Sequence, residues 1–395
     1  MKISIKKYLL YSSVFAIFTE AFFFNYIIDW KLLYLIICIN YYLLFLHQKK
    51  IIIHKYFNYI IVALFVHGII VNSIIGVPIN YMLAQLIGIT IISIYYYNFI
   101  TLFKLNDILK VYLKISLIVA IIGYPMYFLE INLNDGRLQS IFKEPAHYAI
   151  VVIPACYYYL KIKKYLLFAV IFGTLILSNS SLGYIGCALM FIIPNLNYKR
   201  FFSFIAILPF VIGTFYYIYN EYTFLKLRVD DTVESLNAIN TGNFKENANL
   251  SSYSLLSNLF VAKTNVTEHP IGSGIGSHVY MHKKKYLHLI NPPVYLVKQD
   301  LQSSNATDAN SMFVRIISEL GIIGLVLILF FISRAYRCFN TSELYFAQGI
   351  FIYFLLKLFR DGHYFPPELF FFIWLFYSYY KNANDVKITN PNYIK

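Results

Sequence analysis

The sequence contains few charged residues. Asp, Glu, Lys and Arg make up 13% of its 395 residues, whereas hydrophobic residues make up 59% and the mean hydropathy is +0.60. Soluble domains have about 25% charged residues. The core of a soluble protein of 395 residues could not bury this much apolar surface. This composition excludes a soluble globular protein. It indicates an all-α membrane protein whose chain crosses the bilayer many times.

Cysteine and cofactor motifs are also scarce. The four cysteines lie in or beside apolar runs and lack C-x-x-C spacing, so we expect neither a disulfide framework nor a metal site. The glycine-rich run at 270–278 has no strand before it and no helix of a βαβ unit after it, which favours a tight turn over a nucleotide loop. No cofactor is expected. Four histidines of this region are expected to be solvated and not zinc ligands: His269, His278, His282 and His288.

The excess of basic residues has a pattern. The formal net charge is +14, but the lysines form short clusters between apolar runs. Such clusters orient membrane helices, with the basic loops in the cytoplasm. The charge therefore predicts topology and a lipid bilayer as partner, and it does not point to nucleic acid.

The apolar runs predict about twelve spans, each near the ~20 residues that a bilayer requires. If the N-terminus is placed in the cytoplasm, every short inner loop is basic, and both termini are cytoplasmic. The first run is kept as a retained helix because it lacks the small-residue cleavage site of a signal peptide. The predicted spans are 8–28, 32–47, 56–75, 81–102, 111–129, 147–160, 165–179, 183–196, 201–219, 312–333, 344–359 and 365–380.

Three outer segments are polar, charged or long: 130–147, 220–311 and 360–368. The second is too long for a connector, and a loop of that size in a compact protein is usually functional. We expect three regions. Residues 1–219 hold the first nine spans, 220–311 form one large external loop that is partly helical, and 312–395 hold the last three spans and a short cytoplasmic tail.

The segment 308–329 changes from polar to apolar without a proline. Arg315 and Glu319 lie one helical turn apart at this threshold, where they can face each other. Gly321 and Gly324 share a face on which another helix or a lipid-linked substrate could approach the backbone. A capped helix with a good packing face is the alternative. Three ionisable groups lie elsewhere within or near apolar runs, where such groups are often functional: Glu20, His67 and Lys357. Glu20 has no partner that the sequence identifies, and snorkelling is the alternative for Lys357.

Three arginines stand where outer loops meet predicted spans: Arg137, Arg315 and Arg360. Guanidinium groups bind phosphate oxygens in bidentate fashion and stay charged, so three of them at one interface suit a diphosphate. The alternative is that they anchor the helices at the interface. Possible proton acceptors stand near them in the sequence: Glu144, His147, Asp361 and His363.

Several motifs together resemble one family. The pattern N-S-x9-G-x-x-G at 310–324 resembles the signature shared by O-antigen and capsular polysaccharide polymerases of the Wzy type and by O-antigen ligases. The segment RLQSIFKEPAHYA at 137–149 is similar to the family's arginine followed by a proline step into the next helix. NSSLG at 179–183 resembles the family's Thr/Ser-rich turn, and HPIGSGIGS at 269–277 resembles its P-x-G-x-G loop segment.

The resemblance implies a metal-independent glycosyltransferase of the GT-C kind in the bacterial inner membrane. Such an enzyme moves a glycan from a polyprenyl-diphosphate-linked oligosaccharide to the terminal sugar of a second lipid-linked unit, and it needs no cofactor. Its family also implies a chain-length regulator as a possible partner. Arg137, Arg315 and Arg360 would then stabilise the leaving diphosphate, together with contacts from Asn310, Ser311 and Asp361. Glu144 is the first choice of base, followed by His363 and His147.

One departure distinguishes the two activities. The ligases usually have histidine where this sequence has Asn310, and asparagine cannot accept a proton at physiological pH. The departure favours a polymerase. An O-antigen ligase and, from a different class, a transporter of lipid-linked sugar remain alternatives. The transporter is disfavoured because no internal repeats are visible.

Overall fold

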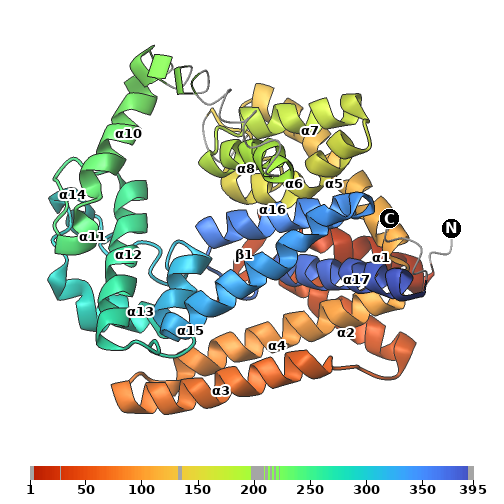
Figure 1. Ribbon diagram of the computed structural model, residues 1–395, viewed down its shortest axis with the longest axis horizontal. Helices are drawn as coiled ribbons and strands as arrows, with labels where there is room; N and C mark the ends of the chain where they lie inside the picture. Colours follow the sequence, from red (N-terminus) through yellow and green to blue (C-terminus); the bar gives the residue numbers. More distant parts are fainter. Residues whose placement is uncertain are drawn as a thin grey trace.

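A computed structural model describes residues 4–26, 28–131, 136–196 and 223–389, with 209, 212–213, 216–217 and 219–221 between them. Helices dominate it (Figure 1). The described N-terminal helices are α1 (Ile5–Ala16), α2 (Leu32–Gln48), α3 (Lys55–Ile75), α4 (Ile79–Leu102), α5 (Leu105–Phe128), α6 (Pro145–Lys161), α7 (Tyr165–Leu177) and α8 (Ser181–Ile192), which a 3₁₀ turn, η1 (Ile193–Asn195), extends.

Helices α2 to α8 coincide with the second to eighth predicted spans. Their ends follow ordinary helix chemistry: Gly76 ends α3 in the left-handed conformation with φ 81°, and Pro145 begins α6 at a position that needs no N–H donor. The ninth predicted span, 201–219, lies largely outside the described residues. The number of twelve crossings stays a prediction.

The prediction of one long first helix at 8–28 is wrong. α1 ends at Ala16, and an antiparallel hairpin follows, made of β1 (Phe23–Tyr26) and β2 (Ile28–Lys31). The apolar run misled the prediction because composition alone does not distinguish a helix from a short hairpin that continues it. The break leaves Glu20 in a turn between α1 and β1.

The long segment 220–311 is largely helical in its described part. It contains α10 (Thr223–Ser235), α11 (Ala238–Thr241), α12 (Leu250–Glu268), α13 (His278–Tyr280), a π-helical turn η2 (Met281–Tyr286), a 3₁₀ turn η3 (Leu287–Leu289) and α14 (Val294–Lys298). Asn249 caps α12, because its side chain accepts a hydrogen bond from the Ser252 N–H at 2.9 Å. A small apolar core around Tyr253, Met281 and Leu296 holds the segment together.

The C-terminal part contains α15 (Met312–Ala335), the 3₁₀ turns η4 (Tyr336–Asn340) and η5 (Ser342–Leu344), α16 (Tyr345–Phe359) and α17 (Pro367–Thr389). α16 packs against α6 and α8, α17 against α4, and α12 against α15. At the α6–α16 contact, a Cβ on Gly349 would lie 2.9 Å from the Pro154 backbone, so only glycine permits this approach. In Figure 1, α10–α14 gather at one end of the molecule and α1 and α17 lie toward the other.

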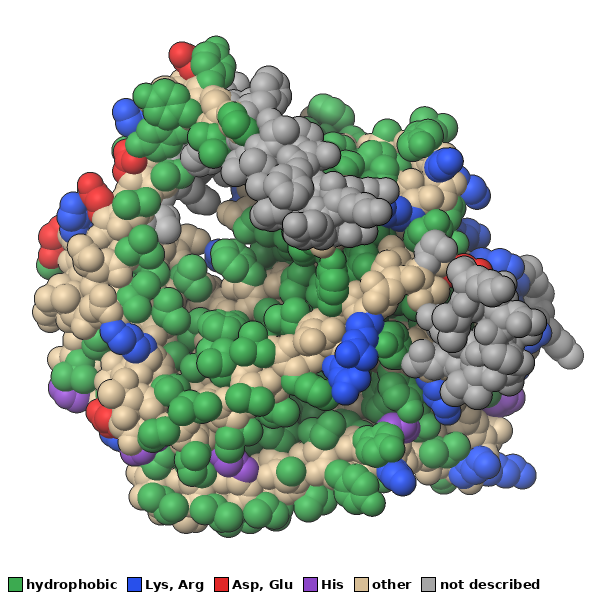
Figure 2. Space-filling model, viewed as in Figure 1, with side chains coloured by type: hydrophobic (Ala, Val, Ile, Leu, Met, Phe, Trp, Pro, Cys, Tyr) green, Lys and Arg blue, Asp and Glu red, His purple; other side chains and the backbone are tan. Residues whose placement is uncertain are grey.

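The chain has the composition and surface of a membrane protein. Among the described helices, three are long and apolar enough to cross a bilayer: Lys55–Ile75, Ile79–Leu102 and Met312–Asn340. Figure 2 shows hydrophobic side chains over most of the middle of this face, whereas charged side chains gather mostly at its two ends. A wide apolar band between charged ends suits a bilayer.

Candidate functional site

The first turn of α6 places two predicted site residues one turn apart. Glu144 is the N-cap in extended conformation, and its side chain makes no capping hydrogen bond. His147 follows in the first turn. Residues three apart on a helix lie about 5–6 Å from each other. Glu144 is exposed and His147 is partly buried.

Two consecutive residues of the linker between α16 and α17 have different backbone conformations. Arg360 ends α16 in extended conformation with φ −147°, and Asp361 adopts the left-handed conformation with φ 66°, which is unusual for a residue with a Cβ. The Asp361 N–H donates to the Asn310 carbonyl at 3.2 Å. A Cβ on Gly362 would lie 1.8 Å from the Asp308 carbonyl oxygen, so the linker is pressed against the entry to α15.

Arg137 and Arg360 line the same cavity, which we call the arginine cavity. Its volume is about 160 Å³. The Arg360 guanidinium donates to the Ser251 hydroxyl at 3.4 Å. The cavity draws on all three predicted outer segments and on the NSSLG turn. Its lining residues are Arg137, Glu144, Pro145, Ala146, Ser180, Ser181, Leu182, Ser251 and Arg360.

Two helix N-termini also reach the arginine cavity. Ser180 is the N-cap of α8 without a side-chain capping bond, and Glu144 and Pro145 begin α6. Helix N-termini carry unpaired N–H groups and partial positive charge, which favour bound phosphate. Two guanidinium groups and two helix N-termini together form a site for an anion.

A second cavity, the carboxylate cavity, is lined by other residues of the same two segments. Its volume is about 260 Å³, and it receives His147 from α6 and Asp361 and His363 from the linker. The other polar residues that line it are Glu20, Lys31 and Glu368, and Tyr34, Phe142 and Phe365 are its aromatic residues. The structure thus brings His147, Asp361 and His363 together and separates them from Glu144.

Lys357 positions Asp361, and its burial argues against the snorkelling alternative. The Lys357 side chain is 1% exposed and forms ion pairs with Asp361 and, at 3.8 Å, with Glu368. Burial acts to raise the pKa of Asp361, but the charge of the neighbouring Lys357 ammonium outweighs it and holds this pKa well below its ordinary range. Asp361 is therefore a carboxylate at physiological pH, able to accept hydrogen bonds.

Sequence reasoning missed the partners of Glu20. Both Glu20 carboxylate oxygens lie 2.8 Å from Nδ1 of His147, and Lys31 Nζ lies 3.6 Å from Oε1. The two residues are 127 positions apart in the chain. The signal that was available is Glu20 itself, an ionisable residue in an apolar run.

Arg315, Asn310 and Ser311 line neither cavity. Arg315 is 1% exposed. Its Nε donates to Glu319 at 3.1 Å, which confirms the predicted i,i+4 pair, and its Nη1 donates to the Gly362 carbonyl at 2.9 Å. The Tyr364 ring lies 4.1 Å from the guanidinium carbon. Arg315 thus joins α15 to the linker, and this satisfied position argues against the expected contact with a diphosphate.

The N-S pair of the motif also has partners within the protein. Ser311 is the N-cap of α15: its hydroxyl accepts from the Val314 N–H at 3.3 Å and donates to the Leu358 carbonyl at 2.7 Å. Asn310 is 2% exposed, and its side-chain oxygen accepts from Asn305 at 2.9 Å. These roles favour the capped-helix alternative for this segment over the substrate contacts expected from it.

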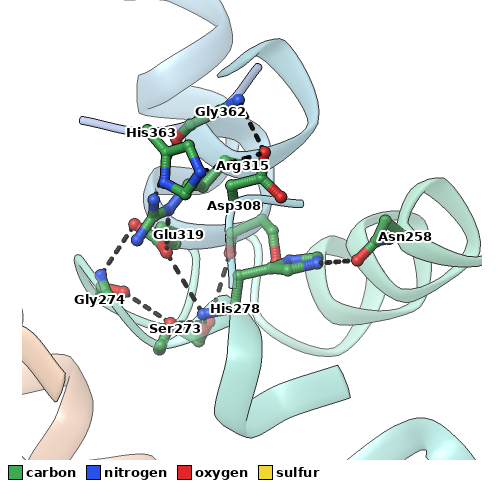
Figure 3. Close-up of polar contacts among 12 residues, drawn as sticks. Asn258, Ser273, Gly274, His278, Asp308, Arg315, Glu319, Gly362 and His363 are labelled. Carbon is green, nitrogen blue, oxygen red and sulfur yellow. Dashed lines mark hydrogen bonds and ion pairs between the residues drawn. The ribbon is translucent and has the colours of Figure 1, made fainter. Parts of the chain in front are cut away.

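The glycine-rich run clamps a kink in α15, and Figure 3 shows its Gly274 in contact with Glu319 of that helix. Gly321 has φ 59° and ψ −140°, which interrupts the helix. The loop supplies the lost partners: the Ile322 N–H donates to the Pro270 carbonyl at 2.9 Å, and the Gly274 N–H donates to the Glu319 carbonyl at 2.8 Å. The run is the tight turn that the sequence favoured. The close approach expected at Gly321 is made by this loop.

The prediction of solvated loop histidines is wrong for His278 and His282, both of which are 0% exposed. One His278 ring nitrogen lies 2.8 Å from the Ser318 hydroxyl and the other 2.9 Å from the Asn258 side-chain oxygen (Figure 3). Burial lowers the pKa of His278 well below its ordinary value and that of His282 to about 4. The neutral rings are part of the core beneath α15.

One group of described residues has the donor types of a metal site. Asp308, Asp361 and His363 bring one ligand atom each within 4.8 Å of one another. Lys357 already compensates the charge of Asp361. We therefore interpret the group as part of the packed linker.

The comparisons with known proteins agree with the resemblance found in the sequence. Residues 166–329 match the model of a family described as O-antigen ligase. The match covers the segment from α7 to α15, and it is consistent with a member of the O-antigen ligase superfamily. It supports a membrane enzyme that processes lipid-linked glycans. The comparison with curated proteins gave no match.

Proposed function

We propose that the protein is a polysaccharide polymerase. It transfers a glycan from a polyprenyl-diphosphate-linked oligosaccharide to the terminal sugar of another lipid-linked unit, on the outer face of the inner membrane. The observation that carries this proposal is the arginine cavity, where Arg137 and Arg360 come from segments more than 200 residues apart and meet beside two helix N-termini.

The chemistry of the cavity matches the need of the reaction. Displacing a diphosphate from an anomeric carbon builds negative charge on the leaving group, and preorganised guanidinium groups stabilise that charge. Arg137 and Arg360 take this role. The proton of the attacking hydroxyl goes to one of three groups, which are Glu144 in the arginine cavity and His147 or His363 in the carboxylate cavity.

Two other functions remain in consideration. An O-antigen ligase would use the same donor and transfer the polymer to a lipid A core, and the family match supports it equally. Asn310 in place of the ligase histidine favours the polymerase. A transporter of lipid-linked oligosaccharide would bind the same diphosphate without breaking a bond.

The test is a transfer assay with purified protein reconstituted in vesicles. Synthetic undecaprenyl-diphosphate-linked repeat units are supplied on the side of the arginine cavity, with and without EDTA. We expect chains of several repeats and released undecaprenyl diphosphate under both conditions. Transfer only to lipid A core would identify a ligase. Movement of intact substrate across the bilayer without release of undecaprenyl diphosphate would identify a transporter.

A further inference from the structure

The carboxylate cavity is separate from the arginine cavity but shares two segments with it. Glu144 and His147 lie one turn apart on α6 and face different cavities, and so do the neighbours Arg360 and Asp361. Because neighbouring residues line the two cavities, a ligand in one cavity lies close to a ligand in the other. A transfer reaction needs two such adjacent sites.

The charges of the carboxylate cavity disfavour a diphosphate. Three carboxyl groups line it, Glu20, Asp361 and Glu368; Lys31 lines it too, and Lys357 forms ion pairs with Asp361 and Glu368 from outside the lining. Carboxylates accept hydrogen bonds from hydroxyl groups, and aromatic rings such as Tyr34 and Phe365 offer apolar faces to the C–H side of a sugar ring. Drug-sized ligands occupy roughly 300–1,000 Å³. A cavity of about 260 Å³ suits one monosaccharide.

His147 has the geometry of a base held by a carboxylate. Its Nδ1 lies 2.8 Å from both oxygens of Glu20, so the ring donates a hydrogen bond from Nδ1, and Nε2 carries no hydrogen when the ring is in its neutral form. Among the described residues, Nε2 has no hydrogen-bond partner. The side chain keeps 24% of its surface exposed where it lines the cavity, and Glu20 keeps 14%. Nε2 is thereby left as an acceptor for a ligand hydroxyl.

We propose that the carboxylate cavity binds the terminal sugar of the acceptor, and that His147, positioned by Glu20, takes the proton of the attacking hydroxyl. This inference rests on the proposed function. It assigns the role of general base to His147. Glu144 lines the arginine cavity, on the leaving-group side of the reaction, and is therefore not the base.

The step balances without a further reactant. The acceptor oxygen forms a bond to the anomeric carbon of the donor as the bond from that carbon to the diphosphate oxygen breaks. The hydroxyl proton moves to Nε2 of His147, and the imidazolium that forms is stabilised by the carboxylate of Glu20. The polyprenyl diphosphate leaves with its electron pair and is held by Arg137 and Arg360.

The experiment measures kcat and the KM for the acceptor in reconstituted vesicles, together with the Kd for undecaprenyl diphosphate. We expect His147→Gln to lower kcat about 10²–10⁴-fold, the usual range for a lost general base. Glu20→Gln lowers kcat less, and Glu20→Asp restores part of it. The Kd for undecaprenyl diphosphate stays within twofold of the wild-type value. The exposed residues Glu130 and His288 supply the matched controls Glu130→Gln and His288→Gln.

Chemical rescue separates proton transfer from a structural role. Added imidazole should restore activity to His147→Ala, because the cavity has room for the missing ring, and it should not stimulate His288→Gln. Unchanged kcat in both His147→Gln and Glu20→Gln would overturn the inference. So would loss of activity without rescue in a His147→Ala protein that still binds undecaprenyl diphosphate. A wild-type protein that neither transfers glycan nor binds undecaprenyl diphosphate would instead refute the proposed function.

Discussion

At the residue scale, the structure divides the three predicted arginines by their surroundings. Arg137 and Arg360 line a cavity, whereas Arg315 is enclosed by Glu319, the Gly362 carbonyl and the Tyr364 ring. The same side chain thus has two uses here. We propose that the two cavity guanidinium groups bind a ligand, whereas the guanidinium of Arg315 joins two segments of the protein.

Replacing either cavity arginine should stop polymerisation without unfolding the protein. We expect Arg137→Ala and Arg360→Ala each to lower kcat about 10²–10³-fold, as for other lost groups that stabilise charge in a transition state. Arg→Lys should restore little activity, because lysine cannot bind phosphate in bidentate fashion. Chain length on gels checks this at equal protein level. Arg334→Ala, at an exposed arginine of α15, is the control. Wild-type chain lengths in both cavity variants would refute the assignment.

Arg315→Ala should act on folding. Its removal leaves Glu319, 0% exposed, without its ion-pair partner, and breaking a buried pair in this way costs about 3–5 kcal/mol. A large fall in the thermal midpoint in detergent, beside an unchanged midpoint for Arg137→Ala and Arg334→Ala, is the expected result. An inactive Arg315→Ala protein of wild-type stability would contradict this structural role and indicate that Arg315 contacts the substrate.

The sequence predicted the residue types of the site better than their partners. Arg137, Arg360 and Glu144 were predicted together because each stands at the edge of an outer segment, and they share a cavity. Glu20 was noticed only as a costly charge in an apolar run. Its contact with His147 depends on α1 ending at Ala16, which hydrophobicity alone does not reveal.

At the element scale, the kink in α15 depends on glycine. Gly321 has φ 59°, and a Cβ there would lie 2.0 Å from the Pro270 carbonyl oxygen. The loop therefore needs both the left-handed backbone and the missing side chain. The motif at 310–324 therefore supplies three features of α15: the N-cap Ser311, the Arg315–Glu319 ion pair and the kink at Gly321.

Gly321→Ala should therefore be much more harmful than a substitution at a glycine with open space. Gly76→Ala is the comparison, since Gly76 also has positive φ, 81°, but its ψ of 24° lies in the left-handed helical region and nothing lies within 4 Å of its added Cβ. We expect Gly76→Ala to lose about 1–2 kcal/mol from backbone strain alone. Gly321→Ala should lose clearly more in thermal unfolding. Equal losses would show that the loop does not clamp the kink.

Helix positions were largely predictable because each apolar run is bounded by charge or proline. The exceptions have physical causes. The first run continues into a hairpin. The segment 220–311 was expected to be partly helical, but its polar sequence did not indicate where the individual helices lie. Burial of His278 and His282 could not be predicted, because it results from α12 packing against α15.

At the scale of the whole molecule, the account requires one topology. The arginine cavity combines residues of 130–147, 220–311 and 360–368, so the proposed function requires these segments to lie on one side of the membrane. The basic loops predict that this side is not the cytoplasm.

Single-cysteine labelling tests the orientation. In a background with the four native cysteines replaced by serine, Lys298→Cys in the external segment should react with a membrane-impermeant maleimide in intact spheroplasts. Lys164→Cys, in a predicted cytoplasmic loop, should react only after permeabilisation. Both side chains are exposed, so accessibility is matched. The reverse pattern would place the arginine cavity in the cytoplasm and remove the proposed donor.

The most direct measurement is the affinity of the purified protein for undecaprenyl diphosphate, compared among the wild type, Arg137→Ala, Arg360→Ala and Arg334→Ala. The account predicts that each cavity variant binds at least tenfold more weakly and that Arg334→Ala binds like the wild type. Equal affinity in all four proteins would contradict it, because the two guanidinium groups would then not hold the diphosphate.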